Sequence, residues 1–455
     1  MRLTGFPLLV ASSLICALSA GAATRPHYGG TLHVVTRAAP TSLDPADSNP
    51  ADWFGSRNLF GLMFDTLVSL DPEGRPEPAL ASSWQAEPGS QRWRFLLRHG
   101  VTFQDGTPVT ADVAAVSLRK TNPTWKVFSE GEAVIIERDS PAPNLPAELA
   151  LLRNAIVKRE GGKISGTGPF ALSQWDPGKK LILAARDEYW GGRAFLDTID
   201  IDMGRNLREQ LLSLDLGKAQ VIEVAPEQAH RATEEGRHLE NSAPIEVVAL
   251  LFARDPQSPE DARQRQAFAL SIDRELLNKV VLQGGGEPAG GLLPNWMTGY
   301  GFLFPASVDL ALARQVRSEI PHTTSWTLSY DPADSVARVI AERIALNARD
   351  AGLGIQITTA SSADLHLVQI PLISLDDQIA LGELAVGLGL PQPKLTSSSV
   401  DDLYGAENKL LQSQRVIPLL HLRTAYGVSN TVKNWATARD GSWRLPDVWL
   451  STEKP

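Results

Sequence analysis

The sequence predicts an α/β protein with two α/β lobes around a cleft. Two strand–helix–strand units carry this prediction: one lies at residues 198–224, with its helix starting near Asn206, and the other lies at residues 325–358. Units of this kind place parallel strands in a sheet. A third observation is the length of 455 residues, which exceeds what one hydrophobic core usually supports. Ligands of such folds bind between the lobes, near the carboxyl ends of the strands.

Residues 1–23 are predicted to form a signal peptide. Arg2 gives a basic start, residues 8–18 form an apolar run, and small residues up to position 23 offer a cleavage site. The apolar run is too short to span a bilayer comfortably. Cys16, the only cysteine, lies in this segment, and a lipid anchor there is not expected because bulky Ile15 precedes it. We therefore expect a periplasmic or otherwise extracytoplasmic protein without disulfides.

The charge of the chain excludes several classes of partner. The sequence has 43 basic and 52 acidic residues, a formal net charge of −9. A chain this acidic is not expected to bind nucleic acid or an anionic membrane surface. We expect a monomer that binds a small molecule or a peptide.

Motifs of the common enzyme classes are absent from the sequence. There is no Gly-x-Ser-x-Gly elbow, no His-Glu-x-x-His pair and no phosphate-binding loop of the Walker type. The histidines are scattered, without the spacing that presents two imidazoles to one metal. We therefore expect no catalysis, no cofactor and no metal. An exported hydrolase whose Ser, His and acid lie far apart in sequence remains an alternative.

The region before residue 140 is predicted to be rich in β-strands. Residues 92–98 alternate, with Trp93, Phe95 and Leu97 on one face and mainly arginine on the other. Asp105-Gly106 predicts a tight turn, because glycine adopts positive φ without strain. Thr110 then predicts the start of a helix, whose free amides its hydroxyl can cap.

Two segments carry a resemblance to a known family. They are residues 101–113, Val-Thr-Phe-Gln-Asp-Gly-Thr-Pro-Val-Thr-Ala-Asp-Val, and residues 166–170, Gly-Thr-Gly-Pro-Phe. Further fragments follow the same order along the chain, at residues 28–32, 43–45, 78–84, 95–103, 188–191 and 261–274. Together they resemble the family 5 solute-binding proteins, the extracytoplasmic receptors of peptide-type ABC importers.

The resemblance implies a periplasmic-binding-protein-like fold of type II, cluster C, in which two α/β lobes and a reduced extra lobe surround the cleft. Lobe I is expected at residues 24–54, 166–250 and 431–455, the reduced lobe II at 55–165, and lobe III at 251–430. Lobes I and III are expected to close on the ligand about two crossing segments. The implied function is capture of a small solute, for which we expect a peptide, and its delivery to an ABC permease in the inner membrane. A truncated receptor that acts as a sensor or scaffold is the alternative on the same fold.

Candidate ligand contacts are aromatic and charged residues near the loops expected at the cleft. Trp53, Phe54 and Arg57 follow the Leu-Asp-Pro loop, although the two aromatic residues also fit the start of a packed helix. A second pair lies in a loop that the resemblance places at the cleft, and a third lies near the return crossing; these residues are Trp296, Tyr300, Tyr426 and Trp435.

The chain departs from the family where peptide receptors hold the ligand's α-ammonium group. The resemblance implies a tryptophan followed by an aspartate in the stretch 364–377, but no tryptophan is present and the acidic position falls near Ile373. Asp376 or Asp377 is the candidate replacement. A buried ammonium group without a charge partner is costly, so ordinary α-peptides fit this chain less well than they fit the family. The glycines at 284–291 are expected to form a loop rather than an anion site.

Overall fold

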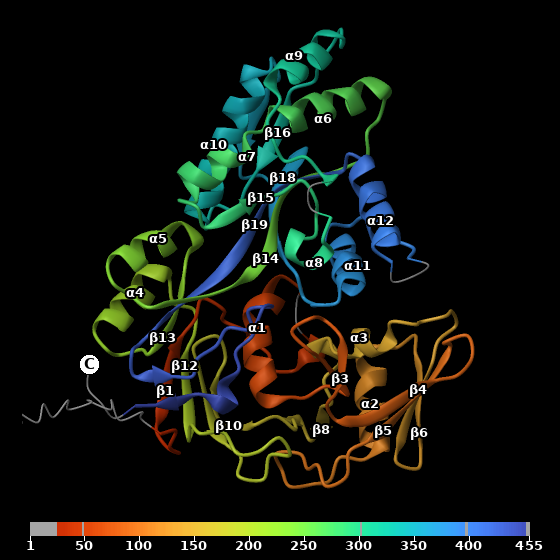
Figure 1. Cartoon of the computed structure of the whole chain (residues 1–455), viewed down its shortest axis with the longest axis vertical. Coiled ribbons are helices and arrows are strands. Elements are labelled where there is room, and N and C mark those ends of the chain that lie inside the picture. Colours follow the sequence, from red (N-terminus) through yellow and green to blue (C-terminus); the bar gives the residue numbers. More distant parts are fainter. Residues whose placement is uncertain (1–24, 48–49, 301–302, 396–398, 452–455) are drawn as a thin grey trace, which may run out of the picture.

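The computed structural model describes residues 25–47, 50–300, 303–395 and 399–451. The predicted signal peptide, including Cys16, lies outside these residues. Figure 1 shows lobe III above lobes I and II. An 11-stranded sheet runs through lobes I and III in the order β10-β11-β12-β1-β13-β19-β14-β18-β16-β17, with β15 paired to β19. The predicted α/β architecture is confirmed.

Lobe I contains the first predicted strand–helix–strand unit. Its helix α4 starts where expected, because Asn206 and Glu209 form a capping box. The Asn206 side chain accepts a hydrogen bond from the Glu209 backbone amide, and the Glu209 side chain accepts one from the Asn206 backbone amide. The elements of this lobe are β1 (Thr31–Val35), β10 (Phe170–Asp176), β11 (Lys180–Ala185), β12 (Thr198–Asp202), α4 (Leu207–Asp215), β13 (Val221–Val224) and α5 (Pro226–Glu234). Strands β12, β1 and β13 are parallel.

Two long antiparallel strands, β14 (Leu239–Phe252) and β19 (Val416–Val428), cross between lobes I and III. The end of β19 pairs with β13 in lobe I, whereas the end of β14 pairs with β18 in lobe III. Their pairing register shifts between Asn241 and Glu246. The two lobes therefore share one sheet, and the predicted limit at residue 250 falls inside a continuous strand.

Lobe III contains the second predicted unit, in which Gly352 adopts a φ of 79° just after the helix and lets the chain turn back. Its strands are β15 (Gly286–Pro288), β16 (Trp326–Ser329), β17 (Ile355–Thr358) and β18 (Leu365–Pro371). Its helices are α6 (Pro259–Ser271), α7 (Arg274–Leu276), η3 (Leu277–Val281), α8 (Asn295–Thr298), α9 (Leu310–Ser318), α10 (Ser335–Asp350), α11 (Asp377–Gly387) and α12 (Val400–Gln412).

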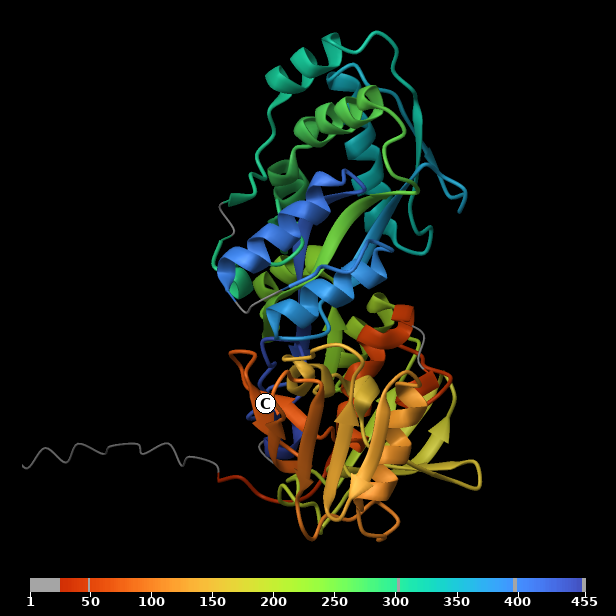
Figure 2. The ribbon, with the colours of Figure 1, turned by 90° about the vertical axis from the view of Figure 1, so that its right-hand side faces the viewer.

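Lobe II is built on a four-stranded sheet of its own, in the order β4-β5-β7-β6. The predicted alternation is confirmed, since Trp93, Phe95 and Leu97 are all buried, and Thr110 caps the following helix by accepting from the Val113 amide. The elements are β2 (Val68–Leu70), β3 (Pro76–Pro78), β4 (Ala81–Ala86), β5 (Arg92–Leu97), α2 (Ala111–Thr121), β6 (Lys126–Glu130), β7 (Ala133–Glu137), α3 (Leu145–Leu149), η2 (Leu152–Asn154), β8 (Lys158–Glu160) and β9 (Lys163–Ser165). Figure 2, turned to face this lobe, shows its sheet below lobe III.

The family-like segments meet at the end of α1 (Pro50–Met63), where lobes I and II join. A Cβ atom added at Gly166 would lie 2.0 Å from the Met63 carbonyl oxygen, and one at Gly168 would lie 2.5 Å from the Met63 carbonyl carbon. The Gln104 side-chain amide donates to the carbonyls of Met63, at 2.9 Å, and Phe170, at 2.8 Å. Only glycine permits this close backbone packing.

Asp65 is the polar centre of the same junction. Its carboxylate accepts hydrogen bonds from the Thr167 hydroxyl at 2.9 Å, the Trp190 indole at 2.9 Å and the Tyr189 hydroxyl at 3.2 Å. Burial raises the pKa of Asp65, while these three donors and the nearby Arg186 guanidinium oppose the rise. The segments that carry the family resemblance therefore hold lobes I and II together. Sequence reasoning missed Asp65, on which these segments converge.

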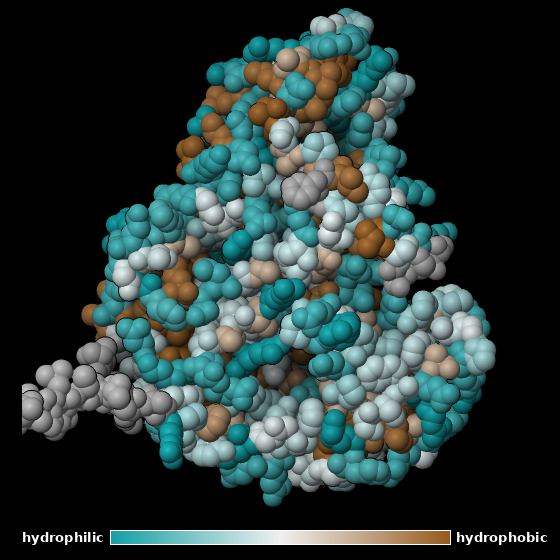
Figure 3. Space-filling model, in the orientation of Figure 1, coloured by the Kyte–Doolittle hydropathy of each residue, from teal (hydrophilic) through white to brown (hydrophobic). Residues whose placement is uncertain are grey.

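The remaining elements are short and lie in lobe I: η1 (Pro45–Asp47), β20 (Val432–Lys433), η5 (Leu445–Asp447) and β21 (Trp449–Leu450). On the face shown in Figure 3, hydrophilic side chains cover most of the surface, and the largest apolar area lies over the upper part of lobe III. Across the described residues, every helix is too short or too polar to cross a membrane.

Candidate ligand-binding cleft

The strand directions indicate that a ligand would bind between lobes I and III. Because β13 and β14 both pair antiparallel with β19, the parallel strands β12, β1 and β13 run toward lobe III, as β14 does. Strands β16 and β18 run against β14 and therefore point toward lobe I. The carboxyl ends of both sets face the same junction (Figure 1), which is where ligands bind in open α/β sheets.

Glu246 lies on the crossing strand β14, where the pairing register shifts. Its half-buried carboxylate accepts from the Gln369 side-chain amide and, at 3.4 Å, from the Thr424 hydroxyl. Burial raises the pKa of Glu246, and the positive charges of Arg37 and Arg57 act against that rise. This carboxylate was not predicted, although a single glutamate in the apolar run 245–252 is a signal that the sequence offers.

Arg57 and Tyr426, both predicted ligand contacts, are buried beside the loop that contains Gly441. Arg57 is 5% exposed, and a Cβ atom on Gly441 would lie 2.7 Å from its guanidinium. Tyr426 is 2% exposed, and its hydroxyl accepts from the Asn58 amide at 3.1 Å and donates to the Gly441 carbonyl at 3.4 Å. Tyr426 is thus buried, and its hydroxyl fixes the loop that contacts Arg57.

Trp435, another predicted contact, is 8% exposed and packs in an aromatic cluster with Tyr426 and Trp443. Its indole donates to the Thr437 hydroxyl at 3.3 Å. The structure therefore gives Trp435 a packing position. Trp53 and Phe54 lie in the first turns of α1, as the helical alternative predicted, but their side chains are outside the described part of the structure.

Trp296 lies on the lobe III side of the cleft, on the short helix α8. Its indole donates to the Pro244 carbonyl of the crossing strand at 2.9 Å. The Arg439 guanidinium, from lobe I, lies 5.7 Å from the centre of the Trp296 ring. This half-buried side chain therefore contacts both a crossing strand and the opposite lobe, which is the position that a clamping residue needs.

Tyr300 lies in the lobe III core rather than at the cleft wall. It is 6% exposed, and its hydroxyl donates to the Glu407 carboxylate at 2.6 Å. The backbone amides of Leu292 and Leu293 donate to the same carboxylate. Burial raises the pKa of Glu407. The structure therefore shows Tyr300, a predicted ligand contact, bound to the buried Glu407 side chain.

The glycine-rich stretch 284–291 forms a loop and the strand β15, and its glycines allow close packing. A Cβ atom on Gly285 would lie 2.3 Å from the Pro226 carbonyl oxygen of lobe I, and one on Gly291 would lie 2.7 Å from the Glu407 carboxylate. The preference for a loop over an anion site agrees with this packing.

Asp376, the predicted replacement for the ammonium anchor, caps helix α11. Its carboxylate accepts from the Ile379 amide at 2.9 Å. Burial raises the pKa of Asp376, and the neighbouring Asp377 carboxylate adds to the rise. Ile373 packs against the hydrophobic core of lobe I. The position where the resemblance implies an acidic anchor thus makes an apolar contact across the cleft.

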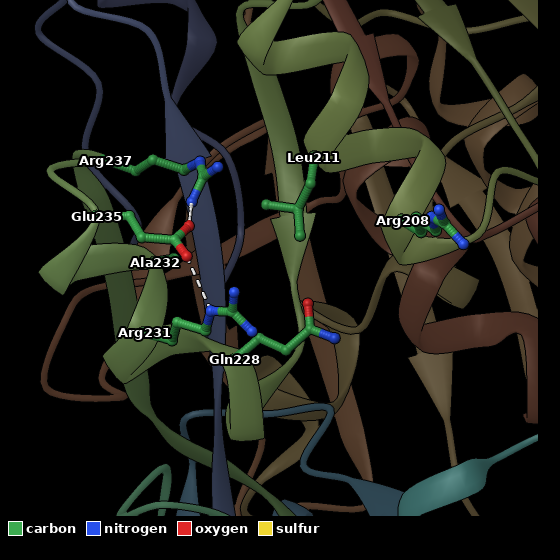
Figure 4. Close-up of a pocket in the computed structure, with 7 residues that line it drawn as sticks. All are labelled: Arg208, Leu211, Gln228, Arg231, Ala232, Glu235 and Arg237. Carbon is green, nitrogen blue, oxygen red and sulfur yellow. Dashed lines mark hydrogen bonds and ion pairs between the residues drawn. The ribbon is translucent and has the colours of Figure 1, made fainter.

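Two cavities lie away from the crossing strands. One, of about 450 Å³, lies between α4 and α5 (Figure 4). Arg237 pairs with Asp215 and Glu235, and Arg231 pairs with Glu235, so acidic neighbours compensate these arginines.

The other cavity, of about 1120 Å³, lies between the loop at 41–47, the β8–β9 hairpin and β10. Its charged lining is also paired: Arg159 binds Asp44 through two hydrogen bonds, at 2.5 and 2.6 Å, and Lys158 binds Asp105 at 2.8 Å. Within the ranges that the structure describes, no three His, Cys, Asp or Glu residues are grouped as a metal site.

The family model of the bacterial extracellular solute-binding proteins, family 5 (middle), matches residues 75–380. The chain belongs to this family. A relative from Escherichia coli K12, the probable D,D-dipeptide-binding periplasmic protein DdpA, is 25% identical over 59% of this chain. The chain spans 58% of the length of that relative. The glutathione-binding protein GsiB of Escherichia coli K12 is 25% identical over 70% of this chain and 67% of its own length.

Solved structures show the same fold. The oligopeptide-binding protein AppA of Bacillus subtilis, in complex with a nonapeptide, superposes with a TM-score of 0.76 and 17% identity. The alignment covers 94% of this chain and 100% of AppA. This likeness confirms the predicted periplasmic-binding-protein-like fold.

Proposed function

We propose that the chain is the extracytoplasmic receptor of an ABC importer, which captures a small solute between lobes I and III and delivers it to a permease of the inner membrane. One observation carries the proposal: two lobes share the crossing strands β14 and β19, and side chains from both lobes meet beside them. A ligand that contacts both walls binds better to the closed state and raises its population. The protein makes and breaks no bond in this role.

The solute class that we propose is a short peptide or peptide-like compound. The relatives named for a D,D-dipeptide and for glutathione support this class. The half-buried carboxylate of Glu246, beside the crossing strands, suits a ligand that carries an ammonium group, and the charge of the buried Arg57 acts on the same carboxylate. Trp296 supplies a flat apolar surface next to the crossing strand β14, and its ring faces Arg439 of the opposite lobe.

The proposal includes the predicted export, location and oligomeric state of the protein. Residues 1–23 act as a signal peptide, the remaining chain is extracytoplasmic without a lipid anchor at Cys16, and it works as a monomer. The predicted contacts Trp53, Phe54, Tyr300, Asp376, Tyr426 and Trp435 stay candidates, but Arg57 and Trp296 together with Glu246 rank first because they lie at the crossing strands.

A thermal-shift panel tests this function. We expect D-alanyl-D-alanine, L-alanyl-L-alanine or glutathione at millimolar concentration to raise the melting temperature of the protein from residue 24 onward, since a ligand that binds only the folded state stabilises it. The amides of the same compounds test whether the carboxylate is recognised. A protein that none of the compounds stabilises, after unfolding and refolding to remove bound solute, contradicts the peptide assignment.

A further inference from the structure

Lobe III touches lobe II directly through the segment Leu372–Glu383, which comprises the loop after β18 and the first turns of α11. We define this segment as the plug. Figures 1 and 2 both show α11 immediately above lobe II. The contacts are made by residues far apart in sequence, and none of them requires a ligand.

An ion pair anchors the far end of the plug. The Arg153 guanidinium, in η2 of lobe II, donates two parallel hydrogen bonds of 2.6 Å to the Glu383 carboxylate of α11. The two side chains are 31% and 23% exposed. Two-point pairing of this kind fixes orientation as well as distance.

The near end of the plug rests on a rigid turn between β2 and β3. The Asp71 carboxylate accepts from the Glu73 amide at 2.9 Å and from the Arg75 amide at 2.8 Å, which holds the turn in place. Gly74, at its tip, has a φ of 83°, and a Cβ atom there would lie 2.4 Å from the Leu375 carbonyl oxygen. A residue with a side chain would therefore push the plug away.

Two further contacts complete the plug. The Asn144 side-chain amide of lobe II donates to Gln378, which is 8% exposed. Ile373 packs against the hydrophobic cluster that joins α1 to the lobe I strands and includes Phe60 and Met63. The plug thus combines an ion pair, an amide pair, a close backbone approach and an apolar contact.

We propose that the plug is a specificity-determining segment, which closes the lobe II side of the cleft with the protein's own atoms and confines the ligand to the side of Glu246 and Trp296. The consequence for ligand choice rests on the proposed function: a long peptide would have to displace the plug, whereas a short one would not. Closure at the plug itself does not depend on that function.

Spin labels on two introduced cysteines measure the closure. The sequence has a single cysteine, Cys16, so the protein from residue 24 onward can carry labels at Ser83→Cys in lobe II and Val339→Cys in lobe III, both exposed positions. The protein is unfolded and refolded first to remove bound solute. We expect one narrow distance distribution for the otherwise unchanged protein. We expect a longer and broader distribution for Arg153→Ala/Glu383→Ala.

Two variants keep this test decisive. Glu383→Gln retains the shape of the side chain and should lengthen the distance less than the alanine pair does. Arg338→Ala/Glu342→Ala removes an exposed ion pair within α10 and should leave the distance unchanged. A ligand-free distance as long in the unchanged protein as in Arg153→Ala/Glu383→Ala would overturn the closure.

Ligand length is tested on the same proteins with alanine peptides of increasing length, from the dipeptide to the hexapeptide. We expect the shortest peptides to stabilise the unchanged protein, and the longest to stabilise only Arg153→Ala/Glu383→Ala. Equal stabilisation of both proteins by the hexapeptide contradicts the specificity role. If no peptide stabilises either protein while the ligand-free distance is narrow and lengthens in Arg153→Ala/Glu383→Ala, the peptide function fails and the closure stands.

Discussion

Replacing Asp65 with alanine is expected to lower the free energy of unfolding by about 4 kcal/mol, because the change removes the shared acceptor of a buried hydrogen-bond network. Three donors, on Thr167, Tyr189 and Trp190, lose their acceptor, and the Arg186 charge loses its neighbour. Urea denaturation at neutral pH measures this loss. The effect should be large because these residues join lobe I to lobe II.

Two matched variants show whether the network is responsible for that loss. Asp65→Asn keeps one carbonyl oxygen as an acceptor and should cost clearly less than Asp65→Ala. Asp139→Ala removes a carboxylate that is 89% exposed, and should change the free energy of unfolding by less than about 0.5 kcal/mol. If Asp65→Ala and Asp139→Ala are equally mild, the junction does not depend on this aspartate.

Acid is expected to destabilise the protein through His421, which lies on the crossing strand β19 and is 3% exposed. Its Nε2 donates to the Leu292 carbonyl at 3.0 Å, because a carbonyl only accepts. Burial lowers the pKa of His421 from 6.5 to about 4. Between these values the unfolded chain binds a proton and the folded chain does not, so stability falls as the pH decreases through this interval. The full difference corresponds to about 3 kcal/mol.

The measurement is the free energy of unfolding as a function of pH, from 7 to 4, for the unchanged protein and for His421→Gln. Glutamine can still donate to the Leu292 carbonyl but does not titrate. The difference between the two curves isolates His421 from carboxylates such as Glu407, whose pKa is raised and whose effect on stability has the opposite sign. Parallel curves would show that His421 is not the acid-sensitive group.

Local chemistry explains why much of the fold is predictable from the sequence. The Asn206 and Thr110 caps, the Gly106 turn and the Gly352 helix end each depend on residues within a few positions. In the strand at residues 92–97, the alternation of apolar and polar residues predicts directly which face is buried. The ordered family-like fragments then supply the arrangement of the lobes, which local patterns alone do not.

The site was less predictable because its residues meet from distant parts of the chain. Glu246 contacts Gln369 and Thr424, more than 100 positions away, and no spacing pattern predicts such a partner. Tyr426 and Trp435 were predicted as ligand contacts because they are aromatic residues near the return crossing, but both side chains are buried in the structure. The departure from the family at residues 364–377 was visible in the sequence, whereas the apolar contact of Ile373 required the structure.

Native mass spectrometry of the protein purified from its own periplasm, without denaturation, tests the central claim most directly, since it shows whether a solute occupies the cleft. We expect the protein to carry a bound compound of small mass. We expect Trp296→Ala and Glu246→Gln each to lower the bound fraction at least about tenfold, as the loss of about 1.4 kcal/mol or more of binding free energy would do. The exposed Glu342→Gln should keep the compound. A protein that carries nothing, or cleft variants that hold the compound as fully as Glu342→Gln does, would contradict the account.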